Sequence, residues 1–170
     1  VSTKNDYYKE DEKAWWKNLE NSLEYLRVKY IDIYNTHGVN RKSYENNVEP
    51  RIGKWLEKAK DQGLIKHICT SFHDNCDALK FIVDTGFYES ITLQYNMLTR
   101  DLEEGIAYAH EKDVGVVVMG PVGGGRLGSD SEILADILPD MRKIPELALK
   151  FVMANPNVNV TLSGMETIQQ

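Results

Sequence analysis

Two residues, Lys4 and His37, each come at the end of a short apolar stretch and carry side chains that donate hydrogen bonds. Either residue alone at such a place is more often structural, since an imidazole can pair with backbone carbonyls. If the two stretches are neighbouring parallel strands, however, an ammonium and an imidazole lie on one wall of a pocket. Two such donors stabilise a substrate oxygen that gains negative charge. We therefore expect a reactive site at this pair.

A glycine-rich segment, Gly120 to Gly128, follows another apolar stretch and contains Arg126. Consecutive glycines are typical of a mobile loop. After a strand they also let backbone amides approach a phosphate, to which Arg126 adds positive charge. The segment has neither a P-loop ending nor the G-x-G-x-x-G spacing of a dinucleotide fingerprint, so it is weak evidence by itself.

Other polar residues follow the remaining apolar stretches, where ligands of parallel α/β folds gather. They are Asn35, Thr70, Ser71, His73, Gln94, Asn96, Ser163 and Gly164. His73 either borders the pocket or caps a helix, and we assign it no role. His67, at the start of its stretch, is expected on the opposite, stabilising face, and His110 on a helix. No spacing of side chains suits a metal ion.

These residues must be positioned by alternating strands and helices, because β-branched apolar stretches alternate with segments of helical period. Strands are predicted at residues 1–3, 30–34, 65–70, 91–95, 114–119 and 158–162. Apolar residues at three- and four-residue steps predict helices over residues 15–26, 52–59, 79–83, 102–109 and 144–152. Gly63 is expected to cap the second helix, and Asp74 or Asn75 the third.

Nearly continuous apolar strands such as 114–118 are typical of parallel sheets covered on both faces. A doubly wound sheet and a closed barrel both fit the alternation, which favours the barrel only slightly. The chain begins inside a strand and stops where a helix starts, and six strands of an eight-stranded barrel leave two raw edges. We therefore expect one domain over residues 1–170, truncated at the N-terminus and at the C-terminus.

Composition narrows the function classes. The apolar content of 42% is enough to bury a core in a single domain. With 26 acidic and 20 basic side chains, the net charge of −6 argues against nucleic acid. Membrane spans and a signal peptide are not expected, and Cys69 and Cys76 form neither a zinc pattern nor a disulfide scaffold. A cytoplasmic protein is the best fit.

Several segments carry a resemblance to a known family. They are residues 1–4, 22–37, 63–72, 93–96, 115–124 and 160–164. Together they closely resemble the aldo-keto reductase family. The resemblance implies a parallel (β/α)8 TIM barrel that reduces carbonyls with NADPH or NADH. It also implies that the chain runs from the third strand through the eighth, as an incomplete barrel of six strand–helix units.

The family's catalytic set is a tyrosine, a lysine, a histidine and an aspartate, and the resemblance places Lys4 and His37 at two of these positions. In such enzymes the tyrosine protonates the carbonyl oxygen, the lysine lowers the pKa of that tyrosine, and the histidine orients the substrate. The tyrosine and the aspartate belong to a region that precedes Val1. Four tyrosines of the chain do not occupy the matching position: Tyr7, Tyr8, Tyr34 and Tyr95. We expect the 170-residue chain alone to be inactive.

The resemblance also implies a nucleotide site. Ser71 and Gln94 match residues that hydrogen-bond the nicotinamide amide, and Met119 stands where many members stack a tyrosine on the ring. Phe72 departs from the asparagine often found beside that serine. The residues that match segments against the pyrophosphate and the adenosine phosphate are Gly123, Gly124, Arg126, Ser163, Gly164 and Met165.

The choice between NADP and NAD stays open, because no arginine stands near Gln170 to bind a 2′-phosphate. The last strand also resembles that of members with an iron–sulfur extension, which places such a cluster only beyond Gln170. The leading hypothesis is an NAD(P)H-dependent reductase of a small aldehyde or ketone. A non-catalytic nucleotide-binding or regulatory subunit with the same fold is the second, and an unrelated barrel enzyme the third. The substrate, the direction and the oligomeric state are not predicted.

Overall fold

The computed structural model describes residues 1–6, 11–128 and 143–164, and within them a single parallel sheet organises the chain. Its strands are β1 (Ser2–Asn5), β2 (Ile31–Val39), β3 (Ile65–Phe72), β4 (Ser90–Gln94), β5 (Gly115–Met119) and β6 (Val160–Thr161). Each strand pairs in parallel with the next along the chain. The predicted alternation of strands and helices is therefore confirmed.

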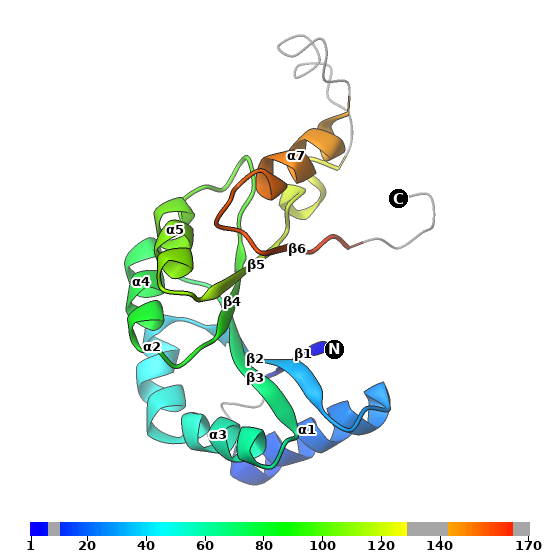
Figure 1. Cartoon of the computed structure of the whole chain (residues 1–170), viewed down its shortest axis with the longest axis vertical. Helices are drawn as coiled ribbons and strands as arrows, with labels where there is room; N and C mark the ends of the chain where they lie inside the picture. Colours follow the sequence, from blue (N-terminus) through cyan, green and yellow to red (C-terminus); the bar gives the residue numbers. More distant parts are fainter. Residues whose placement is uncertain (7–10, 129–142, 165–170) are drawn as a thin grey trace.

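Helices connect the strands and lie along the outer, convex side of the curved sheet (Figure 1). They are α1 (Glu12–Leu26), α2 (Arg41–Ser43), the π-helix η2 (Tyr44–Ile52), α3 (Gly53–Asp61), α4 (Cys76–Asp84), α5 (Glu103–Glu111) and α7 (Ile144–Met153), with the short 3-10 turn η3 (Gly123–Gly125) after β5. Among the described residues, no helix has the length and apolarity that a membrane crossing requires.

The strand order decides between the two folds that the alternation left open. A doubly wound sheet reverses its strand order at a switch point and places helices on both faces. Here the order is β1-β2-β3-β4-β5-β6 without a reversal, and the sheet curves so that β1 and β6 form its two edges (Figure 1). Sequential order with helices outside is the arrangement of a (β/α)8 barrel, of which these strands form an incomplete part.

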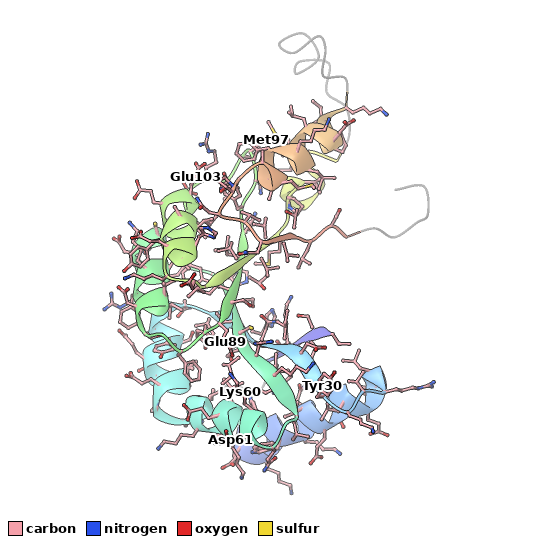
Figure 2. All side chains as sticks on the ribbon, viewed as in Figure 1. Tyr30, Lys60, Asp61, Glu89, Met97 and Glu103 are labelled. Atoms are coloured by element: carbon pink, nitrogen blue, oxygen red, sulfur yellow. The ribbon has the colours of Figure 1, made fainter. Side chains whose placement is uncertain are left out.

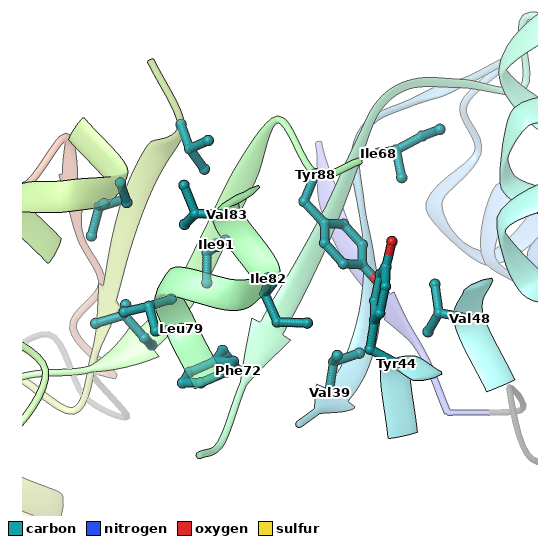
Figure 3. Close-up of a cluster of buried hydrophobic side chains, with 14 of the residues drawn as sticks. Val39, Tyr44, Val48, Ile68, Phe72, Leu79, Ile82, Val83, Tyr88 and Ile91 are labelled. Atoms are coloured by element: carbon teal, nitrogen blue, oxygen red, sulfur yellow. The ribbon is translucent and has the colours of Figure 1, made fainter. Parts of the chain in front are cut away.

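The apolar core lies between the outer face of the sheet and the helices. Figure 3 shows one part of it, where Tyr44 and Val48 of η2 meet Tyr88 and residues of β2, β3 and α4. The Tyr44 and Tyr88 rings pack edge to face, with centroids 6.1 Å apart. At the other end Trp15 of α1 is almost fully buried against Tyr34 of β2. This packing ties α1, η2 and α4 to the strands that carry the candidate site.

Two predicted caps are confirmed. Gly63 has φ +71°, and its N–H and that of Leu64 donate to the carbonyls of Lys60 and Ala59, which is the left-handed closure that a helix end needs. Asn75 rather than Asp74 caps α4, because its side chain accepts from the Ala78 N–H at 3.0 Å.

Several boundaries differ from those predicted. β2 continues past Tyr34 to Val39, because backbone pairing with β1 and β3 does not depend on the polarity of Asn35 to His37. Helical structure after β2 begins at Arg41, well before residue 52, although Pro50 lies within η2. β6 is limited to Val160–Thr161. Sequence periodicity is least reliable at such boundaries.

Candidate active site

Lys4 and His37 come from adjacent strands, as predicted. Lys4 of β1 is the register partner of Asn35 in β2, and His37 follows two residues later. Side chains alternate between the faces of a strand, so Lys4, Asn35 and His37 share one face. Asn35 Nδ2 donates to Ser2 Oγ at 3.2 Å and to the Thr3 carbonyl at 3.1 Å, which links β2 to β1 on that same face. The structure thus brings the two predicted cationic groups together.

Asn5 anchors the carboxyl end of β1 from the opposite face. Its Nδ2 donates to Tyr34 Oη at 2.8 Å and to the Trp15 carbonyl at 3.3 Å. Asn5 is 1% exposed, so this amide satisfies buried polar groups of α1 and β2 that water cannot reach. Because Lys4 directly precedes Asn5, the anchor also places Lys4 on the inner face.

Sequence reasoning missed Asp6. Its Oδ1 forms an ion pair with His37 Nδ1, and both side chains are open to solvent. The parallel register pairs Lys4 with Asn35 and Asn5 with Thr36, so Asp6 and His37 are the next facing positions after the last pair. Only the β1–β2 register, which the structure provides, identifies this contact.

His73, which received no predicted role, lies close to the same pair. Burial lowers the pKa of His73, and the positive charges of His37 and Lys4 lower it further. It also lines a cavity of about 280 Å³ at the carboxyl ends of β3 and β4, together with Gln94 and five other residues: Phe72, Asp74, Thr99, Asp101 and Leu102. His73 therefore connects the Lys4–His37 pair to the part of the face where Gln94 lies.

The predicted nicotinamide residues also come together. Ser71 is fully buried, and its Oγ accepts from the Gly38 N–H at 2.8 Å. Gln94 of β4 and Met119 of β5 are register partners at the ends of their strands. A small donor, an amide and a thioether thus follow one another along the carboxyl edge of β3, β4 and β5.

The predicted phosphate segments follow the next two strands. Gly123 and Gly124 lie in a tight turn with φ of +61° and +67°, a backbone conformation that favours glycine. Arg126 is exposed, and its Nε donates to the Gly123 carbonyl at 3.0 Å. Ser163 and Gly164, both exposed, follow β6, which pairs with β5. Met165 lies outside the described residues.

Two tyrosines face away from Lys4. Tyr34 is buried against Trp15, which raises its pKa, and its hydroxyl accepts from Asn5. The Tyr95 hydroxyl donates to Glu103 at 2.9 Å on α5. Both hydroxyls thus bond to groups other than Lys4, while Tyr7 and Tyr8 lie outside the described residues.

His67 lies at the opposite end of the sheet, as predicted. Its Nδ1 is 2.8 Å from Glu89 Oε2, and Glu89 also binds Lys60 of α3 at 2.8 Å (Figure 2). Burial raises the pKa of Glu89, but hydrogen bonds from His67, Lys60 and the Ile68 amide outweigh it and lower the pKa to about 2. This cluster stabilises the amino ends of the strands. Within the described ranges, no group of three or more His, Cys, Asp or Glu side chains could hold a metal ion.

Curated proteins similar to the chain are oxidoreductases. An uncharacterized oxidoreductase, YqkF, of Bacillus subtilis is 26% identical, over 96% of this chain and 60% of its own length. L-galactose dehydrogenase of Arabidopsis thaliana is 25% identical, over 91% of this chain and 54% of its own length. The chain thus spans a little over half the length of these relatives.

Solved structures similar to the chain are also oxidoreductases. The aldo-keto reductase AKR11C1 from Bacillus halodurans is 27% identical, and both its forms cover 99% of this chain. The holo form superposes with a TM-score of 0.77 and the apo form with 0.80, over 63% and 61% of those chains. None of these comparisons supports an iron–sulfur cluster. The family model of the aldo/keto reductases matches residues 2–143, so this chain belongs to the aldo/keto reductase family.

Proposed function

We propose that this chain supplies the lysine and histidine side, and the nicotinamide face, of a carbonyl reductase that uses NADPH or NADH. The observation that carries the proposal is the pairing of β1 with β2, which sets Lys4 and His37 on one face at the carboxyl ends of adjacent strands. Family membership adds oxidoreductase chemistry and argues against an unrelated barrel enzyme.

The residues present fit a nicotinamide nucleotide. Gln94 has an exposed amide, whose donor and acceptor suit a carboxamide, while Ser71 is fully buried and its Oγ accepts from the Gly38 N–H. Met119 beside Gln94 offers a polarizable surface for a flat ring. Gly123 and Gly124 have positive φ angles, which favour glycine at both positions. Because glycine has no side chain, a phosphate can approach the backbone there. When bound, the nicotinamide supplies the hydride.

Lys4 and His37 act on the carbonyl oxygen. Lys4 is exposed and makes no ion pair within the described parts of the chain, so its ammonium is free to favour the ionised form of an acid beside it. His37 orients the oxygen by a hydrogen bond. No described tyrosine hydroxyl contacts Lys4, and we propose that the acid comes from outside these 170 residues. The substrate is a small aldehyde or ketone, and Cys69 and Cys76, both free thiols, suit the cytoplasm.

Lys4 contacts no tyrosine hydroxyl among the described residues. This favours a second candidate function, a subunit that binds a nucleotide but does not catalyse a reaction. Both candidates predict nucleotide binding at Ser71 and Gln94, and they differ in turnover. The discriminating experiment follows the oxidation of NADPH and of NADH by the whole protein with a panel of small aldehydes and ketones.

We expect turnover that Lys4→Met lowers strongly. Lys17→Met is the matched control, because Lys17 lies on α1 in a solvent-exposed pair with Glu20. A folded whole protein that binds the nucleotide without any turnover would support the subunit. A folded protein that binds neither nucleotide would contradict both candidates.

A further inference from the structure

Asp6 and His37 form an ion pair directly after the last paired residues of β1 and β2. The β1–β2 register advances from Lys4 and Asn35 to Asn5 and Thr36, and Asp6 and His37 follow as the next facing residues. Lys4 and Asn35 are register partners on one face of the sheet, and Asp6 and His37 each lie two residues further along the chain. The ion pair between Asp6 Oδ1 and His37 Nδ1 therefore joins the two chain segments one position beyond their last register pair.

The chemistry of this contact selects one form of the imidazole. An ionised carboxylate only accepts hydrogen bonds, so the ring nitrogen that faces Asp6 must carry a proton. In a neutral ring the other nitrogen, Nε2, then has a lone pair, and it becomes a donor when the ring is protonated. Because Asp6 binds Nδ1, Nε2 is the ring nitrogen of His37 that can contact a substrate.

The Asp6 carboxylate is a negative group in a region where the other nearby charges are positive. Lys4 from β1 and His73 beyond β3 face the same region, and both carry or gain positive charge. Asp6 is the negative group in direct contact with the ring. Both members of the pair are largely exposed, 42% for His37 and 66% for Asp6, so the contact adds little stability. Its effect is on the orientation and the tautomer of the ring.

We propose that Asp6 is a positioning residue for His37: its carboxylate accepts from Nδ1–H, so that Nε2 faces the carbonyl site and, in the doubly protonated ring, donates to the carbonyl oxygen. The role of Asp6 in catalysis rests on the proposed function. The tautomer itself is a property of the chain and can be measured without any turnover.

The test is the nitrogen spectrum of the chain with 15N-labelled histidine, recorded at a pH where the rings are neutral. The sequence contains four histidines, and the variant His37→Gln assigns the His37 signals by their disappearance. We expect the Nδ1–H pattern for His37. Asp6→Asn keeps an acceptor oxygen and should keep this pattern, whereas Asp6→Ala should shift His37 towards the Nε2–H pattern.

His67 is the internal control, because its Nδ1 faces Glu89 at 2.8 Å and should keep its pattern in both Asp6 variants. An Nε2–H pattern for His37 in the unmodified chain, or no change in Asp6→Ala, would overturn the proposal. In the whole protein, Asp6→Ala should lower kcat and kcat/KM by the same factor, and Asp6→Asn should restore part of the loss. If the unmodified protein shows the tautomer but no turnover, the proposed function fails and the tautomer assignment stands.

Discussion

The amide of Asn5 lies at the centre of the contacts that place Lys4, so replacing it tests the construction of the site. Asn5→Ala removes the donor to Tyr34 Oη at 2.8 Å and to the Trp15 carbonyl at 3.3 Å. Tyr34 is fully buried, and its hydroxyl loses the donor that the structure gives it. We expect this variant to be less stable and to loosen the end of β1.

The magnitude follows from the cost of a buried polar group. Leaving one unsatisfied costs about 1–3 kcal/mol, and a neutral hydrogen bond contributes about 1 kcal/mol, so Asn5→Ala should lower the free energy of unfolding by about 2–3 kcal/mol. Tyr34→Phe should cost about 1 kcal/mol, because Asn5 keeps its bond to Trp15. The double variant should cost about 2–3 kcal/mol, which is less than the sum of the single variants.

Urea unfolding followed by tryptophan fluorescence measures these values. Asn46→Ala is the matched control: its Nδ2 also donates to a backbone carbonyl, that of Lys42 at 2.8 Å, but on the exposed surface. It should change the free energy of unfolding by less than about 0.5 kcal/mol. Additive single and double variants, or an Asn5→Ala variant as stable as the control, would refute the reasoning.

Three further results are expected. Arg27→Gly should raise the free energy of unfolding by about 0.5–1 kcal/mol in the same assay, because Arg27 ends α1 with φ +53°, and an unchanged value would contradict this. The lowered pKa of Glu89 means that its contribution to stability is present above its unfolded pKa and is lost as the pH falls towards about 2; Glu89→Gln should remove this part of the pH dependence of unfolding. The pKa of His73 is lowered, so its protonation costs stability as the pH drops below the ordinary histidine range. In an NMR titration, Lys4→Met should raise the pKa of His73, and an unchanged pKa would show that the two charges do not interact.

The alternation of parallel strands and helices could be predicted from the sequence because parallel strands leave a strong apolar pattern, whereas the choice of a barrel needed the strand order. Residues 114–118 form a continuous apolar stretch that became β5, and Gly63 closes α3 as its conformational freedom indicates. The sequence pattern predicted the helix after β2 only from residue 52 onward, whereas the structure is helical from Arg41. Pro50 argues against a helix in a local reading, and the burial of Tyr44 and Val48 that favours it is a tertiary effect.

The candidate site could be predicted only in part. Lys4 and His37 were found because strand ends are where parallel folds place ligands. Asp6 was missed because its importance depends on the β1–β2 register, which sequence periodicity does not specify. The position of His73 near Lys4 depends likewise on how far β3 extends beside β2.

The central claim is that this chain provides Lys4 to a site of hydride transfer, and isotope transfer tests it most directly. The whole protein is incubated with an aldehyde and a nicotinamide nucleotide that carries deuterium at the transferable position, and the alcohol is analysed by mass spectrometry. We predict that deuterium appears on the carbinol carbon and that Lys4→Met slows this transfer while nucleotide binding persists. An unlabelled alcohol, or transfer by Lys4→Met at the unmodified rate, would contradict the account.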